Sequence, residues 1–269
     1  MNDLSAVNMN EEESIAFIEK CCEESIAVLQ EMKSPRGIRR AVDLPDKDTL
    51  NAAVLNSTMI AFPEGMSRRN KTIIKRTFLF ADLSAEIKYP NQKDASLRLA
   101  YMLRGLNAMG WAHFGKPDTY EETSSTGVTM SNVVLDIIKA AIGGVGGTVG
   151  AAMKLGAEAA IKGLEGNKEA LKLYEKNGKK AGGSNFGVAS ASENKDEDVY
   201  LVVGAISYTI QSGNTQIAFF DKTTSSSSVA KGHGVFTMYP PEDFTAKKEA
   251  AANKFYEAVD AALEMEFGF

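Results

Sequence analysis

The sequence predicts an α+β fold, a single domain over residues 1–269 in which helical layers wrap a central antiparallel sheet. Helical periodicity dominates residues 10–180, apart from one strand-like segment, whereas strand-like runs separated by turn residues fill residues 185–239. The chain is 44% hydrophobic and 24% charged, as is typical of globular domains. No internal repeat or clean linker divides the chain, so we expect one sheet with helices packed around it.

Composition and charge exclude several classes of protein. The net charge of −5 and the mean hydropathy of −0.18 fit neither a disordered chain, nor a collagen-like fibre, nor a multi-span membrane protein. A mildly acidic chain without an arginine-rich stripe is not expected to bind nucleic acid. The N-terminal residues contain no basic n-region and no apolar h-region, so no Sec-type signal is expected.

The first half of the chain predicts three helices and one strand. Apolar residues recur every three or four positions over Asn10–Met32, which indicates an amphipathic helix, and a short helix is expected after Pro45 with Leu50, Val54 and Leu55 inward. Period-two alternation over Thr72–Tyr89 predicts one long strand, or two with a bend. Asp94 is expected to cap a helix that runs to about Phe114, and residues 115–127 are expected to form a loop.

Residues 133–153 form the unusual part of the sequence, an apolar run that continues into closely spaced glycines. Ala140–Met153 carries no charge and spans about 21 Å as a helix, less than the roughly 30 Å of a bilayer core. Extension to Val133 adds Asp136 and Lys139, which can pair. Two alternatives therefore remain for residues 133–153: a segment that enters a membrane only under certain conditions, or a buried helix that lies close against the sheet. The glycines predict a kink or break near residues 143–147. The residues of this predicted membrane-interacting helix are Val134, Ile138, Ile142, Gly143, Gly147, Gly150 and Met153.

The glycine spacing has two further interpretations. A phosphate loop requires Gly-Lys-Ser/Thr, and a dinucleotide fingerprint requires a preceding strand, and neither is present. Small residues at four-residue spacing, such as Gly143, Gly147 and Ala151, favour close helix packing instead. We therefore expect no cofactor.

A lysine-rich amphipathic segment follows from Lys154 to Lys180, with seven lysines and four glutamates. A basic helix beside an apolar one suits an anionic membrane surface, and a solvated helix face is the alternative. The predicted basic membrane-surface face consists of Lys154, Lys162, Lys168, Lys172, Lys176, Lys179 and Lys180.

The last third predicts four strands and a closing helix. The strand-like runs are Asn185–Ser192, Val199–Ile210, Thr215–Asp221 and roughly Val229–Tyr239, joined by turn residues as in an antiparallel meander. Val199–Ile210 is apolar on both faces, as is typical of a central strand. An acidic helix is expected over residues 242–266.

No catalytic signature is present, and we expect no enzyme. His113 and His233 stand 120 residues apart, so a metal site is not expected. The run Ser225–Ser228 lacks a nucleophile context. The adjacent Cys21 and Cys22 do not fit disulfide geometry; a reactive or lipidated cysteine is one alternative, and a small core residue is expected.

Residues 128–240 resemble the second half of the Cyt-type cytolytic δ-endotoxins and the similar fungal volvatoxins. The likeness rests on the apolar helix, its amphipathic continuation, Gly182–Gly183 and the runs SNFGVASASENKDEDVYLVVGAISYTI, TQIAFFDK and GVFTMYP. It implies an antiparallel sheet wrapped by helical hairpins, direct binding to lipid membranes, helices that leave the sheet, and self-association into pore-forming or bilayer-disrupting oligomers. It also implies a protein kept in the cytoplasm or a crystalline inclusion, released without a Sec signal and active at a target-cell membrane.

Three functions are therefore weighed. The first is a membrane-active toxin or virulence protein without enzymatic chemistry. The second is a soluble protein that binds a lipid or another apolar ligand between helices and sheet. The third is a hydrolase or nucleotide-dependent enzyme, which would require His113, His233 or a serine cluster to come together.

Overall fold

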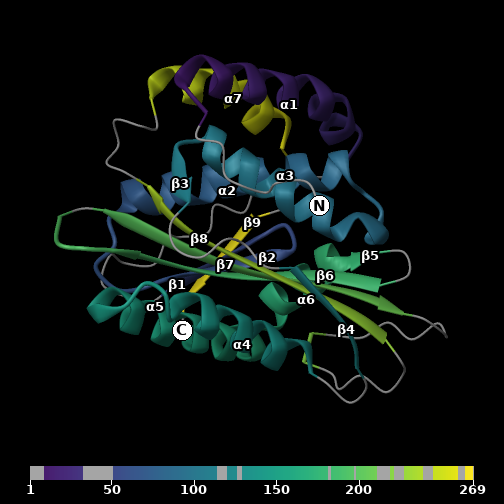
Figure 1. Ribbon diagram of the computed structural model, residues 1–269, viewed down its shortest axis with the longest axis vertical. Coiled ribbons are helices and arrows are strands. Elements are labelled where there is room, and N and C mark those ends of the chain that lie inside the picture. The colour runs from purple at the N-terminus through teal and green to yellow at the C-terminus, as the bar shows by residue number, and fades with distance from the viewer. Residues whose placement is uncertain are drawn as a thin grey trace.

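The computed structural model has an α+β fold in which helices cover both faces of one sheet (Figure 1). It describes residues 9–32, 51–113, 120–125, 129–180, 183–196, 198–210, 219–220, 227–238, 245–259 and 264–268. The fold class predicted from the sequence is confirmed.

The sheet of the described chain is nine-stranded, in the order β3-β8-β7-β6-β2-β1-β9, with β4 also on β8 and β5 also on β6. Strands β6, β7 and β8 form the predicted antiparallel meander, and β7 is central in it. One pair, β2 with β6, is parallel, so the sheet is mixed rather than purely antiparallel. The strands are β1 (Asn51–Leu55), β2 (Thr58–Phe62), β3 (Trp111–His113), β4 (Tyr120–Ser125), β5 (Lys179–Lys180), β6 (Gly183–Glu193), β7 (Val199–Ile210), β8 (Ser227–Met238) and β9 (Glu264–Gly268).

Both faces of the sheet are apolar, and a separate hydrophobic cluster lies on each. Leu201 and Val203 of β7 belong to the cluster under helices α2 (Arg68–Lys88) and α3 (Ala95–Ala108). Val202 and Ile206 of the same strand belong to the cluster under α4 (Met130–Ile142), α5 (Gly147–Gly166) and α6 (Lys168–Gly178). Strand β7 is therefore buried on both of its faces, as the apolar pattern of Val199–Ile210 predicted.

The strand predicted over Thr72–Tyr89 is wrong, because this segment is α2. Its N-terminus is capped by Ser67, whose Oγ accepts a hydrogen bond from the Asn70 N–H at 3.2 Å. Residues 77–85 of α2 are all buried, since the helix is enclosed between the sheet and a second helical layer. A helix buried around most of its circumference shows no 3.6-residue pattern, which explains the error.

Three further predictions need correction. The inward Val54 and Leu55 of the supposed short helix belong to β1, whereas the residues before Asn51 lie outside the described chain. Residues 120–125 of the supposed loop form β4, paired with β8.

The C-terminal helix is shorter than predicted. Helix α7 spans Ala246–Ala258, and the strand β9, which pairs with β1, includes the last residues of the predicted helix. Of the predicted strand Thr215–Asp221, only Phe219 and Phe220 are described, in a turn.

The helices predicted over Asn10–Met32 and after Asp94 are both present. The lysine-rich segment Lys154–Lys180 is interrupted at Asn167, between α5 and α6, and ends in β5. Helix α1 spans Glu11–Met32, and Asp94 occupies the N-cap position of α3 after a short 3-10 turn, η1 (Gln92–Asp94), although its side chain makes no capping bond. Helix α3 ends at Ala108, and Trp111 begins β3 rather than extending the helix to Phe114.

Helices α1 and α7 pack together as an outer layer over α2 and α3 (Figure 1). Phe255 of α7 packs edge-on against Phe80 of α2, with ring centroids 5.0 Å apart. Phe17 of α1 packs against Tyr101 of α3, with ring centroids 5.3 Å apart. This face of the sheet therefore carries two helical layers, and the opposite face carries one.

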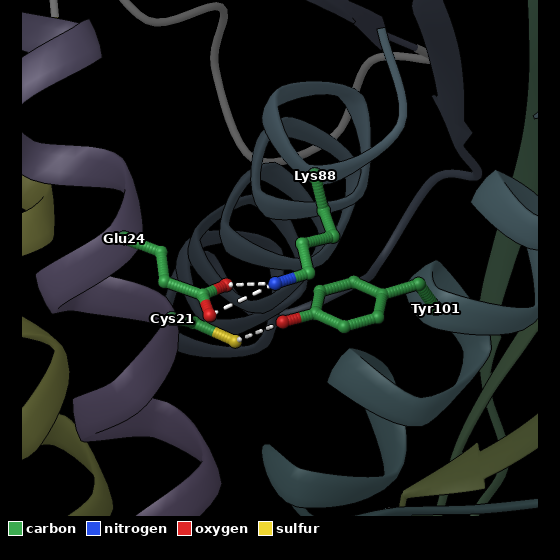
Figure 2. Close-up of polar contacts among 4 residues, drawn as sticks. All are labelled: Cys21, Glu24, Lys88 and Tyr101. Atoms are coloured by element: carbon green, nitrogen blue, oxygen red, sulfur yellow. Dashed lines mark hydrogen bonds and ion pairs between the residues drawn. The ribbon is translucent and has the colours of Figure 1, made fainter.

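Polar contacts at the edge of the outer layer bind it to the inner one (Figure 2). The Lys88 Nζ donates to both carboxylate oxygens of Glu24 at 2.9 Å, and the Cys21 Sγ lies 3.3 Å from the Tyr101 Oη. Cys21 and Cys22 are both buried core residues, as expected, and both are free thiols. Burial raises the pKa of each thiol to about 11.

These thiols should report whether the outer layer stays in place. At pH 8 we expect Cys21 and Cys22 of the native protein to react with iodoacetamide about 100-fold more slowly than in denaturant, because the raised pKa suppresses the thiolate. Mass spectrometry of the alkylated peptides measures both rates, and a Cys22→Ser variant isolates Cys21. Equal rates in native and denatured protein would contradict the buried position of α1.

Candidate membrane-interacting site

The apolar segment predicted as a membrane-interacting helix forms two helices, α4 and α5, joined by a glycine turn. Helix α4 ends at Ile142, and α5 begins at Gly147. Gly146 and Gly147 have φ angles of +69° and +58°, a region that side chains disfavour. The predicted break near residues 143–147 is confirmed, and glycine is required there by the backbone itself.

Most residues of the predicted membrane-interacting helix face the protein core. Val134, Ile138 and Ile142 of α4 and Met153 of α5 are buried in the cluster beneath the sheet. Gly150 is buried too, and a Cβ added there would lie 3.6 Å from Ile142 Cγ2, so the two helices approach closely. Gly143 and Gly147, by contrast, are exposed. A bilayer can reach the five buried residues only after the hairpin moves.

The exposed side of the α4–α5 hairpin carries no charge between Ala140 and Met153. We call this surface the uncharged tip; its exposed members are Ala140, Gly143, Gly144, Gly146, Gly147, Thr148 and Ala151. Leu155 lies one helical turn after Ala151 and extends the uncharged tip. The exposed fraction of Leu155 is 66%. The stripe Gly143, Gly147 and Ala151 therefore packs against no other helix of the described chain.

No helix among the described residues combines the length and the apolar character that a bilayer crossing requires.

The predicted basic face is largely exposed and lies in the same helical layer as the uncharged tip. Lys154 and Lys162 project from α5, and Lys168, Lys172 and Lys176 form a stripe at four-residue spacing on α6. We call these three residues the lysine stripe. Lys179 is half-buried in β5, and the Lys180 side chain lies outside the described part.

Specific contacts hold the hairpin on the sheet. The Ser190 Oγ of β6 donates to the Met153 carbonyl of α5 at 2.8 Å. Within the hairpin, Lys139 of α4 pairs with Glu158 of α5 at 2.8 Å rather than with the predicted partner Asp136, and this pair lowers the pKa of Glu158. Helix α4 rests on Gly204 of β7, where an added Cβ would lie 2.9 Å from Ile138 Cγ1.

Helix α6 is held on the sheet more firmly than the α4–α5 hairpin is, because an aromatic cluster anchors it. The rings of Tyr174, Phe186 and Phe219 pack with centroid distances of 4.9 to 5.2 Å. The buried Tyr174 Oη donates to the Gly187 carbonyl of β6 at 2.9 Å, and burial raises its pKa well above the ordinary value. The lysine stripe is thus displayed on a fixed helix.

The fold brings the two histidines closer together than the sequence suggests. His113 lies on β3 and His233 on β8, which are paired strands, and both are half-buried. Burial, with a smaller effect of His113, lowers the pKa of His233. Within the described residues, no three His, Cys, Asp or Glu side chains are grouped so that they could hold a metal. Ser227 and Ser228 are part of β8 and pair with β4, whereas Ser225 lies outside the described part.

Sequence reasoning missed one group of polar residues, at the other face of the sheet. Asn56, Asp82 and Glu86 come together beside a cavity between α2, α3 and the sheet. The strand predicted over Thr72–Tyr89 does not reveal this group, because Asp82 and Glu86 lie one turn apart only in a helix.

The close packing of α4 on β7 can be tested with one methyl group. Gly204→Ala should lower the free energy of unfolding by about 1–3 kcal/mol, because Ile138 and Ile137 must shift. Urea denaturation measures the change.

Gly166→Ala is the matched control, because a Cβ at the end of α5 meets no atom within 4 Å. This control should change stability by less than about 0.5 kcal/mol or increase it slightly. Equal effects of the two substitutions would show that α4 does not press on Gly204.

Comparison with known proteins gives fold-level neighbours only. No family model and no curated protein matches the chain. A solved structure titled delta-endotoxin is 16% identical, with a TM-score of 0.41 over 79% of this chain and 94% of that one. The structure of the Evf virulence factor is 11% identical, with a TM-score of 0.32 over 81% of this chain and 87% of that one. Structures similar to this chain thus include a delta-endotoxin and a virulence factor.

Proposed function

We propose that the protein is a membrane-active toxin or virulence protein that binds lipid bilayers directly and disrupts or perforates them after helices leave the sheet. The observation that carries the proposal is the helical layer below the sheet, which displays the uncharged tip at the start of α5 and exposed lysines on α5 and α6. Lysines attract anionic headgroups, and an uncharged surface enters the headgroup region without the cost of burying charge.

The first contact would use the surface as it stands. Each lysine near an anionic membrane contributes about 1 kcal/mol, so the lysine stripe supplies about 3 kcal/mol. Leu155 is exposed on the same layer and adds apolar area at the membrane. Initial binding therefore needs no rearrangement, and it weakens as salt screens the lysines.

The second step would separate the α4–α5 hairpin from the sheet. Its buried face consists of apolar side chains such as Val134, Ile138 and Ile142, and these lose little when they exchange the protein core for acyl chains. Among the described residues, few polar contacts oppose the separation, chiefly the Ser190 bond to the Met153 carbonyl and the bond from the Ser131 N–H to the Phe219 carbonyl. The Lys139–Glu158 pair lies within the hairpin and moves with it.

Separation would uncover the lower face of the sheet, including Phe186, Val202 and Ile206. Exposing such side chains to water costs about 1.5–3 kcal/mol each, so lipid or a second copy must cover them. Self-association on the membrane is therefore part of the proposal. Strands β6, β7 and β8 contain 11, 12 and 12 residues, enough for the 9–11 that a tilted membrane strand needs.

We propose no catalytic step, cofactor, metal or nucleic-acid partner for this function. The alternative of a soluble lipid carrier receives no support from the cavity between α2, α3 and the sheet. That cavity measures about 60 Å³, whereas sites that enclose a lipid-sized ligand measure several hundred.

Vesicle binding and dye release test the proposal. Replacement of Lys168, Lys172 and Lys176 by Gln should weaken binding to anionic vesicles about 100-fold at low salt. Dye release should fall with binding, and binding to neutral vesicles should change little.

The control variant replaces three exposed lysines of the outer layer, Lys20, Lys247 and Lys254, by Gln. It has the same net charge as the first variant and should bind anionic vesicles as well as the unaltered protein, within about threefold. Equal weakening by both variants would place the membrane contact elsewhere. No leakage by intact or protease-trimmed protein, from neutral or anionic vesicles, would refute the function.

A further inference from the structure

The outward face of α5 carries the most exposed large apolar side chain of the described chain. Leu155 is 66% exposed, whereas Leu97 of α3, the next in order, is 46% exposed. Ala159 and Gly163 follow Leu155 at four-residue spacing and are half-buried, so the three residues form one row along the helix. We call Leu155, Ala159 and Gly163 the α5 row. Covering this row with a partner would remove apolar surface from water, which is favourable.

The charged residues of α5 alternate in sign along the helix. In chain order they are Lys154, Glu158, Lys162 and Glu165, and all four are at least partly exposed. Their charges sum to zero, so α5 taken alone has no preference for an anionic bilayer. A face that carries both signs in equal number suits a partner that also carries both signs.

The alternating order is complementary to itself when a second α5 runs in the opposite direction. With the Ala159 residues of the two copies near a two-fold axis, Lys154 of one copy lies opposite Glu165 of the other. In the same arrangement Glu158 lies opposite Lys162 of the other copy. The two-fold axis repeats both pairs, so every charge of α5 faces an opposite charge. A parallel arrangement in register would place like charges opposite one another.

Lys154 and Glu165 are available for this pairing. Both side chains are exposed, and neither forms a salt bridge or hydrogen bond with another described residue. They stand 11 positions apart, which is about 16 Å along a helix, so they do not pair with each other in one chain. Glu158 already pairs with Lys139 of α4, so the Lys154–Glu165 contact is the main charge pair of the interface.

The antiparallel arrangement also covers the α5 row. Leu155 of one copy lies near Gly163 of the other, where the absence of a side chain leaves room for it. The two Ala159 side chains meet near the axis. Small residues at these positions let the two helix axes approach to about 8 Å.

We propose that the outward face of α5 is an interface through which two copies of this chain pair antiparallel in water. The partner is a second copy because one reversed helix matches both the charge order and the exposed leucine. The pairing does not depend on the proposed membrane function. Where both hold, Leu155 reaches a bilayer only after the two copies separate.

Sedimentation velocity of the full chain, without lipid, measures the pairing. Between about 1 and 100 µM we expect a monomer–dimer equilibrium with a Kd on the order of 10 µM, the weak end of protein–protein affinities. A two-fold contact closes at two copies. A protein that is monomeric at the highest concentration, or one that grows into larger species, would therefore overturn the proposal.

Charge reversal locates the interface. Lys154→Glu and Glu165→Lys each place like charges opposite one another twice, so each variant alone should dimerise at least about 10-fold more weakly. A mixture of the two variants should form a heterodimer within about threefold of the original Kd, because every contact then joins opposite charges. Lys20→Glu on α1 is the control and should leave the Kd unchanged.

Recovery on mixing is a result that damage to the fold of either variant does not produce. Circular dichroism of each variant confirms that it is folded. A mixture that dimerises no better than its separate components, or single variants that dimerise as well as the unaltered chain, would refute the pairing.

A single introduced cysteine tests the direction of the two helices. Ala159→Cys should cross-link to its counterpart under mild oxidation, because both lie near the axis, whereas Thr148→Cys, 11 positions earlier, should not. The native Cys21 and Cys22 are buried. Equal cross-linking at positions 148 and 159 would contradict an antiparallel pair.

Vesicle assays on the same proteins separate this proposal from the membrane function. A dimer that mixes as expected but releases no dye supports the pairing and counts against the membrane function. A chain that stays monomeric and still releases dye would refute the pairing and leave the membrane function standing. Loss of vesicle binding in Lys154→Glu, in a chain that never dimerises, would assign this face of α5 to the bilayer instead.

Discussion

The structure depends on a sheet whose central strands are apolar on both faces. In β7, Leu201 and Val203 point to one cluster and Val202 and Ile206 to the other, so neither face is stable in water without a cover. The helices supply these covers, two layers above and one below (Figure 1). The positions of the α4–α5 hairpin, the buried thiols and the enclosed α2 all follow from this requirement.

The two covers differ in how they are held. The upper one is double, with α1 and α7 joined to α2 and α3 by aromatic packing and by contacts such as Glu24–Lys88 (Figure 2). The lower one is a single layer, in which α6 is anchored by Tyr174 while the α4–α5 hairpin rests mainly on apolar contacts. A cover held mainly by apolar contacts is the one that an apolar medium can replace, and this is the physical basis of the membrane proposal.

The sequence alone predicts the elements that have one solvent-facing side or a long alternating pattern. Helix α1 and strands β6 to β8 belong to this group, as does the break at Gly146 and Gly147, where glycine chemistry is local. Helix α2 was predicted as a strand because burial on opposite sides removes its helical period. Strands β1, β4 and β9 are short, and distant partners determine them.

The candidate site divides in the same way. The sequence predicts which apolar and basic residues belong to the site. It does not predict which side of the α4–α5 hairpin faces the sheet. Gly143, Gly147 and Ala151 have spacing that is typical of packed helices and yet are exposed, because the apolar Val134 and Ile138 take the inner side. The cavity beside Asp82 was beyond prediction, since its floor requires the register of three strands.

The central claim is that the α4–α5 hairpin must leave the sheet for the protein to disrupt a bilayer. A disulfide between Gly156→Cys of α5 and Ser190→Cys of β6 tests it directly, because a Cβ added at Gly156 lies 3.6 Å from the Ser190 Oγ. Dye release from anionic vesicles by the oxidised double variant should fall at least about 10-fold while vesicle binding persists. Reduction, with each single variant as control, should restore release. Equal release by the oxidised and reduced forms would contradict the account.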